Sequence, residues 1–243
     1  RPLNSGAFSL AGINDVLQLD YDQDITARAD KLTYITPVVN GFQAGVTYAP
    51  DAELNDGTAV DRDDENDNFG DSYEIAARYD GEMDAVTYSL GAGFSHSEVE
   101  DDTANARYQP FNAGGVATDD RQAWNIAARA NWSGFGLGVA YMEDDLGIDN
   151  DGDQETLVVG GDYTTGPFKV GLSWFNREQE LGATNGDYDV DRFAGGVVYT
   201  YAPGLTFRGS VNYTEFDNMT NVLATADDSP DATSVLLGTQ INF

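Results

Sequence analysis

The sequence predicts an all-β protein, a transmembrane antiparallel β-barrel, and three observations support this prediction. Apolar and polar residues alternate with period two along eleven segments, as in strands with one face toward lipid and one toward water. Short turns alternate with long acidic loops between these segments. Aromatic residues gather at both ends of the apolar faces, as they do at the two interfaces of a membrane.

The alternation defines each strand to within a few residues. In 121–132, for example, Trp124, Ile126 and Trp132 share one face, and Asn125 and Arg129 lie on the other. Helical spacing fits none of the segments. The predicted strands are 31–37, 42–49, 71–80, 84–96, 121–132, 135–143, 155–164, 167–178, 190–201, 205–216 and 233–243.

The connections differ in length from one end of the strands to the other. The short ones contain the Gly, Asn and Pro residues that tight turns need. They fall near 38–41, 80–82, 133–134, 164–166 and 202–204, and the long acidic ones at 50–70, 97–120, 144–154, 179–189 and 217–232. Short turns on one rim and long loops on the other are typical of outer-membrane barrels.

The aromatic residues of the apolar faces form two predicted bands. One band lies beside the short turns, at Phe42, Tyr79, Trp132, Phe135, Tyr163, Phe168, Tyr201 and Phe243. The other lies toward the long loops, at Tyr48, Tyr73, Trp124, Tyr141, Trp174 and Tyr213. The alternative is a sandwich core with scattered aromatics, which would not need bands that follow the type of turn.

Composition excludes several classes of function. The chain has 243 residues, with 42 acidic and 12 basic residues, one histidine and a formal charge of −30. Such a surface disfavours nucleic acid, which needs clustered Lys and Arg, and favours cations. The sequence has no cysteine, which excludes disulfides and thiolate metal sites, and no apolar run of about 20 residues that could form a membrane helix.

The last strand alternates up to the terminal residue, through Val235, Leu237, Ile241 and Phe243. We therefore expect Phe243 to act as an assembly signal, read by the barrel-assembly machinery. Eleven strands is an odd number, whereas bacterial single-chain barrels close with an even number. Either Val16–Tyr21 forms a twelfth strand, or the chain lacks N-terminal strands.

The stretch from Arg28 to Pro37, with Lys31 and Tyr34, is followed by the turn Asn40-Gly41-Phe42 and by Tyr48. This stretch resembles the general diffusion porins of Gram-negative outer membranes. The resemblance implies that the chain holds eleven strands of a 16-stranded, N-terminally truncated barrel. Residues 1–30 would then be the tail of the pore-constricting extracellular loop, and 31–243 the barrel strands. It also implies a homotrimer that conducts ions and small hydrophilic solutes by passive diffusion.

The same resemblance implies a pore constriction in which loop carboxylates face basic residues of the wall. Its candidate residues are Asp15, Asp20, Asp22, Asp24, Arg28 and Lys31. The loop signature Pro-Glu-Phe-Gly-Gly of the family is absent from this sequence, so the choice among the four Asp residues stays open.

Alternation also places several charged side chains in the lumen, because an Arg that faces lipid at mid-depth costs about 2–4 kcal/mol. These pore-lumen candidates are Glu74, Arg78, Arg129, Lys169, Arg177, Arg192 and Arg208. Two interpretations stay open: these basic residues sort ions, or carboxylates such as Glu74 and Asp162 merely balance them.

The long acidic loops predict a negative vestibule that concentrates cations, so we expect a cation preference. The run Asp149-Asn150-Asp151-Gly152-Asp153 does not fit the EF-hand spacing, and we predict no metal site and no cofactor. Weak divalent binding that bridges the loops to lipopolysaccharide remains an alternative to an ordinary acidic turn.

An enzyme is a second class to consider, because some outer-membrane hydrolases pair a Ser with a His. The single histidine, His96, is flanked by Ser95 and Ser97, which must point to the opposite face of a strand. We therefore predict a channel and no catalytic residue. The alternatives are a complete 12-stranded barrel, acting as a substrate-specific channel or a hydrolase, and a soluble acidic ligand-binding β protein.

Overall fold

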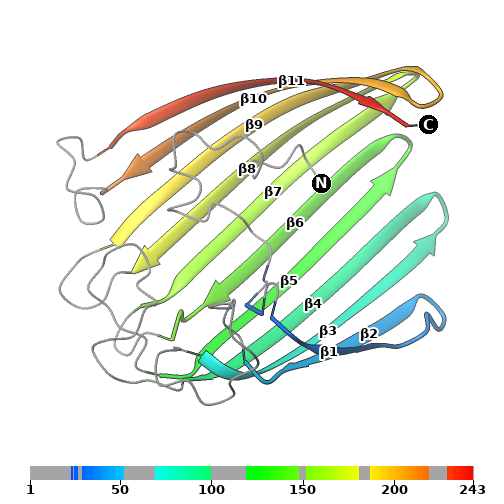
Figure 1. Ribbon diagram of the computed structural model, residues 1–243. Coiled ribbons are helices and arrows are strands. Elements are labelled where there is room, and N and C mark those ends of the chain that lie inside the picture. Colours follow the sequence, from blue (N-terminus) through cyan, green and yellow to red (C-terminus); the bar gives the residue numbers. More distant parts are fainter. Residues whose placement is uncertain are drawn as a thin grey trace.

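The computed structural model describes residues 23, 25–26, 29–51, 69–99, 119–147, 152–180, 187–218 and 229–242. They form a single antiparallel sheet of 11 strands, in which each strand pairs with its neighbours in the sequence (Figure 1). Among these residues no helix could span a membrane. The strands are β1 (Leu32–Ile35), β2 (Phe42–Ala49), β3 (Phe69–Met83), β4 (Val86–Val99), β5 (Arg121–Trp132), β6 (Phe135–Asp144), β7 (Gln154–Thr165), β8 (Phe168–Glu180), β9 (Asp187–Ala202), β10 (Leu205–Asp217) and β11 (Asp231–Ile241).

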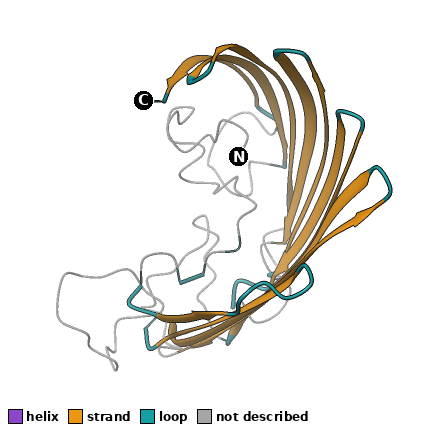
Figure 2. Cartoon of the chain, turned by 90° about the vertical axis from the view of Figure 1, so that its right-hand side faces the viewer, coloured by secondary structure: helices purple, strands orange, loops and turns teal. Residues whose placement is uncertain are grey.

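The sheet is strongly curved, with a concave and a convex face (Figure 2). β1 and β11 are its two edges in the described part of the chain. All eleven predicted strands are present, so the all-β, antiparallel prediction is confirmed.

Some strand boundaries differ from the predicted ones. β1 ends at Ile35 rather than at 37, because Pro37 has no N–H to donate to a ladder. The β3–β4 hairpin is longer than predicted: Gly81 and Glu82, interpreted as a turn, stay paired, and the ladder closes at Met83↔Val86. A Cβ at Gly81 would lie 2.4 Å from the Tyr88 ring, so this glycine leaves the space that the ring fills. β9 begins three residues earlier than predicted, at Asp187, opposite Glu180 of β8.

Two short turns have the backbone geometry that their sequences predict. Asn40 and Gly41 have φ values of 50° and 84°, and Ser133 and Gly134 have 49° and 87°. Two consecutive left-handed residues are the geometry of the tight hairpin turn that favours Asn-Gly. At Gly41 a Cβ would lie 2.1 Å from the carbonyl oxygen of Asp80, so only glycine fits there.

The convex face is apolar and exposed. Ile126 is 52% exposed, Val170 47% and Leu172 76%, although all three lie within paired strands. A continuous apolar face of this extent is stable against lipid and unfavourable in water.

Aromatic rings form two rows along the convex face, as predicted. Near the short turns, Phe135 and Tyr163 lie 4.4 Å apart between ring centroids. Near the long connections, Trp124 and Tyr141 lie 5.3 Å apart. Trp124 and Trp132 belong to the same strand and are separated by about 26 Å of extended chain. The two rows therefore bracket a band that matches the apolar part of a membrane.

Candidate pore wall

The charged residues of the strands are divided unequally between the two faces. The concave face holds all seven basic residues of the described strands, Arg78, Arg121, Arg129, Lys169, Arg177, Arg192 and Arg208. It also holds five carboxylates, Glu74, Asp80, Glu82, Asp144 and Asp162. In the described strands the convex face has no basic residue and twelve carboxylates, Asp71, Glu98, Glu143, Glu155, Glu178, Glu180, Asp187, Asp189, Asp191, Glu215, Asp217 and Asp231. The acidic excess of the sequence therefore does not lie on the concave strand face, where bases outnumber acids.

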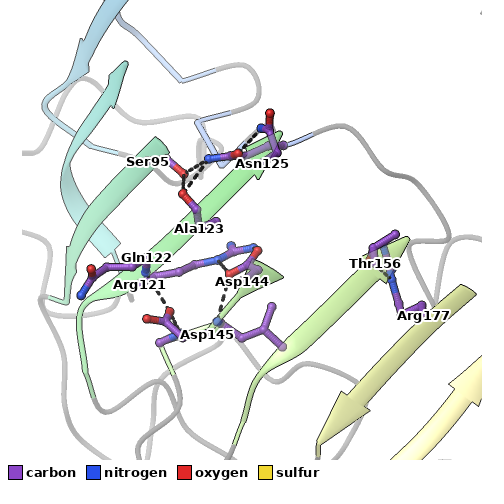
Figure 3. Close-up of polar contacts among 12 residues, drawn as sticks. Ser95, Arg121, Gln122, Ala123, Asn125, Asp144, Asp145, Thr156 and Arg177 are labelled. Atoms are coloured by element: carbon purple, nitrogen blue, oxygen red, sulfur yellow. Dashed lines mark hydrogen bonds and ion pairs between the residues drawn. The ribbon is translucent and has the colours of Figure 1, made fainter. Parts of the chain in front are cut away.

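At the long-loop end, the concave face carries a buried ion pair. The Arg121 guanidinium donates to both carboxylate oxygens of Asp144, from Nε to Oδ1 at 2.9 Å and from Nη2 to Oδ2 at 2.5 Å (Figure 3). The side chains are only 14% and 6% exposed. Asp144 Oδ1 also accepts the N–H of Leu146 at 2.9 Å, so this pair fastens the residues after β6 to β5.

Two further arginines of this end are packed rather than open. Arg177 is 2% exposed, and its Nε donates to Thr156 Oγ1 at 3.0 Å (Figure 3). The guanidinium of Arg192 lies 4.6 Å from the centroid of the Phe175 ring, and that of Arg177 lies 5.5 Å from it. Their surroundings are those of structural arginines that stack on an aromatic face.

Near the short turns the charged side chains are open to solvent. Arg129 Nη2 donates to Asp162 Oδ2 at 2.7 Å, and Lys169 Nζ lies 2.9 Å from Asp162 Oδ1. The side chains of Arg129 and Lys169 are 49% and 47% exposed, so neither belongs to a buried structural ion pair. A Cβ at Gly136, in the strand between Arg129 and Asp162, would lie 2.8 Å from both side chains. This glycine gives Arg129 the room to reach across β6.

Two more arginines near the short turns lie on strands to either side of this cluster, Arg78 on β3 and Arg208 on β10. Arg78 Nη2 donates to Asp80 Oδ2 at 2.6 Å, and Ser89 Oγ donates to Asp80 Oδ1 at 2.7 Å. Arg208 Nη2 donates to the neutral side-chain oxygen of Gln240. The Nε of Arg208 is buried and has no hydrogen-bond partner among the described residues.

A short segment before β1 is tied to the concave face. The Gln23 side chain donates from Nε2 to Ser95 Oγ and, at 3.0 Å, to the Ala123 carbonyl, and its Oε1 accepts from Asn125 Nδ2 (Figure 3). Thr26 is fully buried. These contacts place Gln23 inside the curve of the sheet, against β4 and β5.

Lys31 joins the same segment to β3. Its Nζ donates to Thr26 Oγ1 at 2.8 Å, and Thr26 Oγ1 donates to Glu74 Oε1 at 3.1 Å. Of the predicted constriction residues, only Lys31 is described. The others, Asp15, Asp20, Asp22, Asp24 and Arg28, lie outside the described residues, as does Phe243. Their predicted roles remain predictions.

Several wall residues were missed by sequence reasoning. Gln23, Thr26, Ser95 and Asn125 are ordinary polar residues, and no local pattern links positions that lie about a hundred residues apart. Gly136 carries no local signal of its role either. Only the strand register shows that Gly136 lies between Arg129 and Asp162 and leaves room for their ion pair.

The Ser–His pair considered for an enzyme is divided between the two faces. His96 lies opposite Tyr73 and Gln122 on the convex face, with its Nε2 3.8 Å from Asp120 Oδ2. Ser97 hydrogen-bonds to Ser72 Oγ at 2.5 Å on the concave face, where Ser95 also lies. Because β4 continues to Val99, His96 lies within a strand, whereas the predicted strand 84–96 ended at this residue.

Asp145, which follows β6, is a carboxylate outside the strands. Burial raises its pKa, although the N–H groups of Gln122 and Gly147 donate to it at 2.7 and 3.1 Å and oppose that rise. The neighbouring Asp144 raises its pKa further, while Arg121 lowers it. Asp145 therefore fixes loop geometry at the edge of the wall.

The convex face carries a row of carboxylates at the long-loop end, beyond the aromatic row that lies near the long connections. In the strand register Glu155 pairs with both Glu143 and Glu178, and Asp189 pairs with both Glu178 and Asp217. Five adjacent strands thus place like charges opposite one another. Such pairs destabilise a sheet unless they are screened.

Replacing Glu178 by Gln is therefore expected to stabilise the protein at low ionic strength. The change removes two like-charge oppositions, each worth about 0.2–1 kcal/mol. The midpoint of urea unfolding should rise for Glu178→Gln and approach the unmodified value in about 1 M salt. Glu82→Gln is the matched control, because Glu82 lies opposite Thr87. An equal rise in both variants would contradict the explanation.

The curved antiparallel sheet, its lipid-facing aromatic girdles and its charged concave wall define the class of outer-membrane β-barrel porins. The sequence profile of the Gram-negative porins matches residues 2–219, and the chain belongs to this family. The protein is therefore one of the bacterial outer membrane. No curated protein sequence matches the chain.

Solved structures of porins share the fold. The chain has 19% identity to the anion-selective porin from Comamonas acidovorans, with a TM-score of 0.55 over 87% of this chain and 57% of that one. The values for Salmonella typhi OmpF in complex with daunomycin are 15%, 0.59, 94% and 71%. A trimer form of Vibrio cholerae OmpT gives 14%, 0.54, 93% and 73%. The chain thus spans 57% of the length of the Comamonas porin.

Proposed function

We propose that the protein is a passive diffusion channel for ions and small hydrophilic solutes, with a preference for cations. One observation supports this most strongly: a single curved sheet has a convex face with an apolar band between two aromatic rows, and a concave face that bears all the basic residues of the described strands. A pore lined by charged side chains selects ions by its electric field and by its width, and it needs no reactive group. No catalytic residue is part of this proposal.

The proposed cation preference depends on the acidic rim and not on the strand wall. The convex carboxylates and the rim residues Asp119, Asp120 and Asp153 surround the long-loop end, whereas the concave strand face is slightly basic. Fields from the rim extend about 8 Å at physiological salt. The rim therefore acts on ions that approach the entrance, before they meet the wall.

Reversal potentials measured across a planar bilayer test this preference. In a KCl gradient we expect K⁺ to permeate faster than Cl⁻ at low salt, and the difference to shrink in about 1 M salt, where the screening length is about 3 Å. Discrete conductance steps would establish the channel itself. A preference for Cl⁻ would contradict the role assigned to the rim, and absence of steps would contradict the channel.

The remaining roles in this proposal follow from the family and the sequence. We infer that residues 1–30 form the tail of the pore-constricting loop, with Asp15, Asp20, Asp22, Asp24, Arg28 and Lys31 at the constriction. The contacts of Gln23 and Thr26 inside the curve support this placement. A homotrimer, contacts with lipopolysaccharide, and recognition of Phe243 by the barrel-assembly machinery complete the proposal.

A further inference from the structure

Four basic residues of the concave face lie toward the short turns. Arg78 belongs to β3, Arg129 to β5, Lys169 to β8 and Arg208 to β10, each in the half of its strand next to the short turns. Lys169 and Arg208 both lie opposite Val198 of β9, so the register places them side by side with one strand between them. We call these four residues the basic arc.

Carboxylates neutralise the basic arc only in part. Asp80 faces Arg78 alone, whereas Asp162 is shared between Arg129 and Lys169. Arg208 is bonded to the neutral Gln240. Glu82 lies one step nearer to the turn on β3, opposite Thr87. The described strand residues of this level, four bases and three carboxylates, therefore keep one net positive charge, and Asp84 lies beyond them in the β3–β4 turn.

The opposite end of the wall is bordered by an acidic rim. At that end Arg121 is held by Asp144 and Arg177 is buried. Arg177 and Arg192 both pack on Phe175, and the rim around these residues is acidic. A channel with a negative mouth and a positive mouth concentrates cations at one end and anions at the other. When the field drives each ion inward from its own end, both accumulate and the conductance rises.

We propose that the basic arc is an anion-attracting zone that makes the channel rectify, with the larger current when the long-loop side is positive. The zone would also interact with small multivalent anions, such as phosphate and dicarboxylates, that arrive from the short-turn side. This inference depends on the proposed channel function. It assigns selectivity to Arg129, Lys169 and Arg208, and it leaves Arg121, Arg177 and Arg192 as structural residues.

Single-channel current–voltage curves test the proposal on the unmodified protein. In about 0.1 M KCl, where the screening length is about 10 Å, the ratio of currents at opposite voltages should exceed one, and in about 1 M KCl it should approach one. Because the sequence has no cysteine, Thr164→Cys and a thiol reagent added on one side identify the short-turn side of each inserted channel. Adding phosphate on that side should reduce the current more than adding it on the other.

Charge removal then tests the residues. In Arg129→Gln/Lys169→Gln/Arg208→Gln the ratio should fall toward one and K⁺ selectivity should rise, while Arg129→Lys/Arg208→Lys should keep both unmodified values. Folding of each variant is checked by heat-dependent migration in detergent. A symmetric or reversed curve in the unmodified protein at low salt, or an unchanged ratio in the neutral variant, overturns the inference. In both cases the channel still conducts, whereas absence of conductance would contradict the channel function as well.

Discussion

Replacing Ile126 by Arg is expected to reduce the folding stability of the barrel by about 1–4 kcal/mol, because an Arg that faces lipid costs about 2–4 kcal/mol at mid-depth and less toward the girdles. Ile126 lies in the middle of β5 on the convex face, between the levels of Trp124 and Trp132, and is 52% exposed. Its cross-strand neighbours are Ala92 and Tyr141, which offer no counter-charge. A guanidinium at this position would have to lie in the apolar band between the two girdles.

Ala127→Arg is the matched control, because the next residue of the same strand faces the concave side. Its neighbours across the sheet are Gly91 and Ala140, which leave room for a long side chain. We expect a change within about 0.5 kcal/mol, as for an ordinary surface substitution. Urea unfolding of both variants in lipid vesicles provides the comparison. Equal losses would show that the assignment of the two faces is wrong.

Replacing Asp144 by Ala is expected to cost about 3–5 kcal/mol, because it leaves the buried charge of Arg121 without its carboxylate. The same change also removes the acceptor for the Leu146 N–H. The loss should appear as a lower midpoint of urea unfolding.

Two comparisons distinguish this explanation from a general loss of charge. Asp162→Ala removes the carboxylate of an exposed pair, so the expected loss is below about 1 kcal/mol. The double variant Arg121→Met/Asp144→Leu should recover much of the loss, because an apolar pair of similar volume often replaces a buried ion pair without penalty. A double variant no more stable than Asp144→Ala would contradict the loss of the carboxylate beside the buried Arg121 charge as the cause.

The two predictions depend on the sequence to different degrees. That Ile126 faces lipid follows from period two alone. Side chains alternate along a strand, and the face that carries Trp124, Ile126 and Trp132 is the apolar one, which turns toward lipid. The Arg121–Asp144 pair does not follow from it. Arg121 was not among the predicted lumen residues, and its partner lies 23 positions away, at the end of the next strand.

The roles of the seven predicted lumen residues show the same limit. Alternation places Arg129 and Arg177 on the same face, but Arg129 is half exposed whereas Arg177 is buried against Thr156. Glu74, interpreted as a partner for basic side chains, accepts instead from Thr26. Which arginines meet solvent depends on packing from other strands and loops, and period two carries no information about that.

The sequence by itself determined the strands, the two faces, the turn types and the family, because each is written in local periodicity and in residues with special backbone angles. Only the tertiary structure decided how charge is distributed on the wall. The register aligned Lys169 with Arg208 across Val198, put Gly136 beneath the Arg129–Asp162 pair and set the convex carboxylates in a row. Ion pairs act over a few ångströms in space, and distances of that kind between distant residues exist only after the strands have paired.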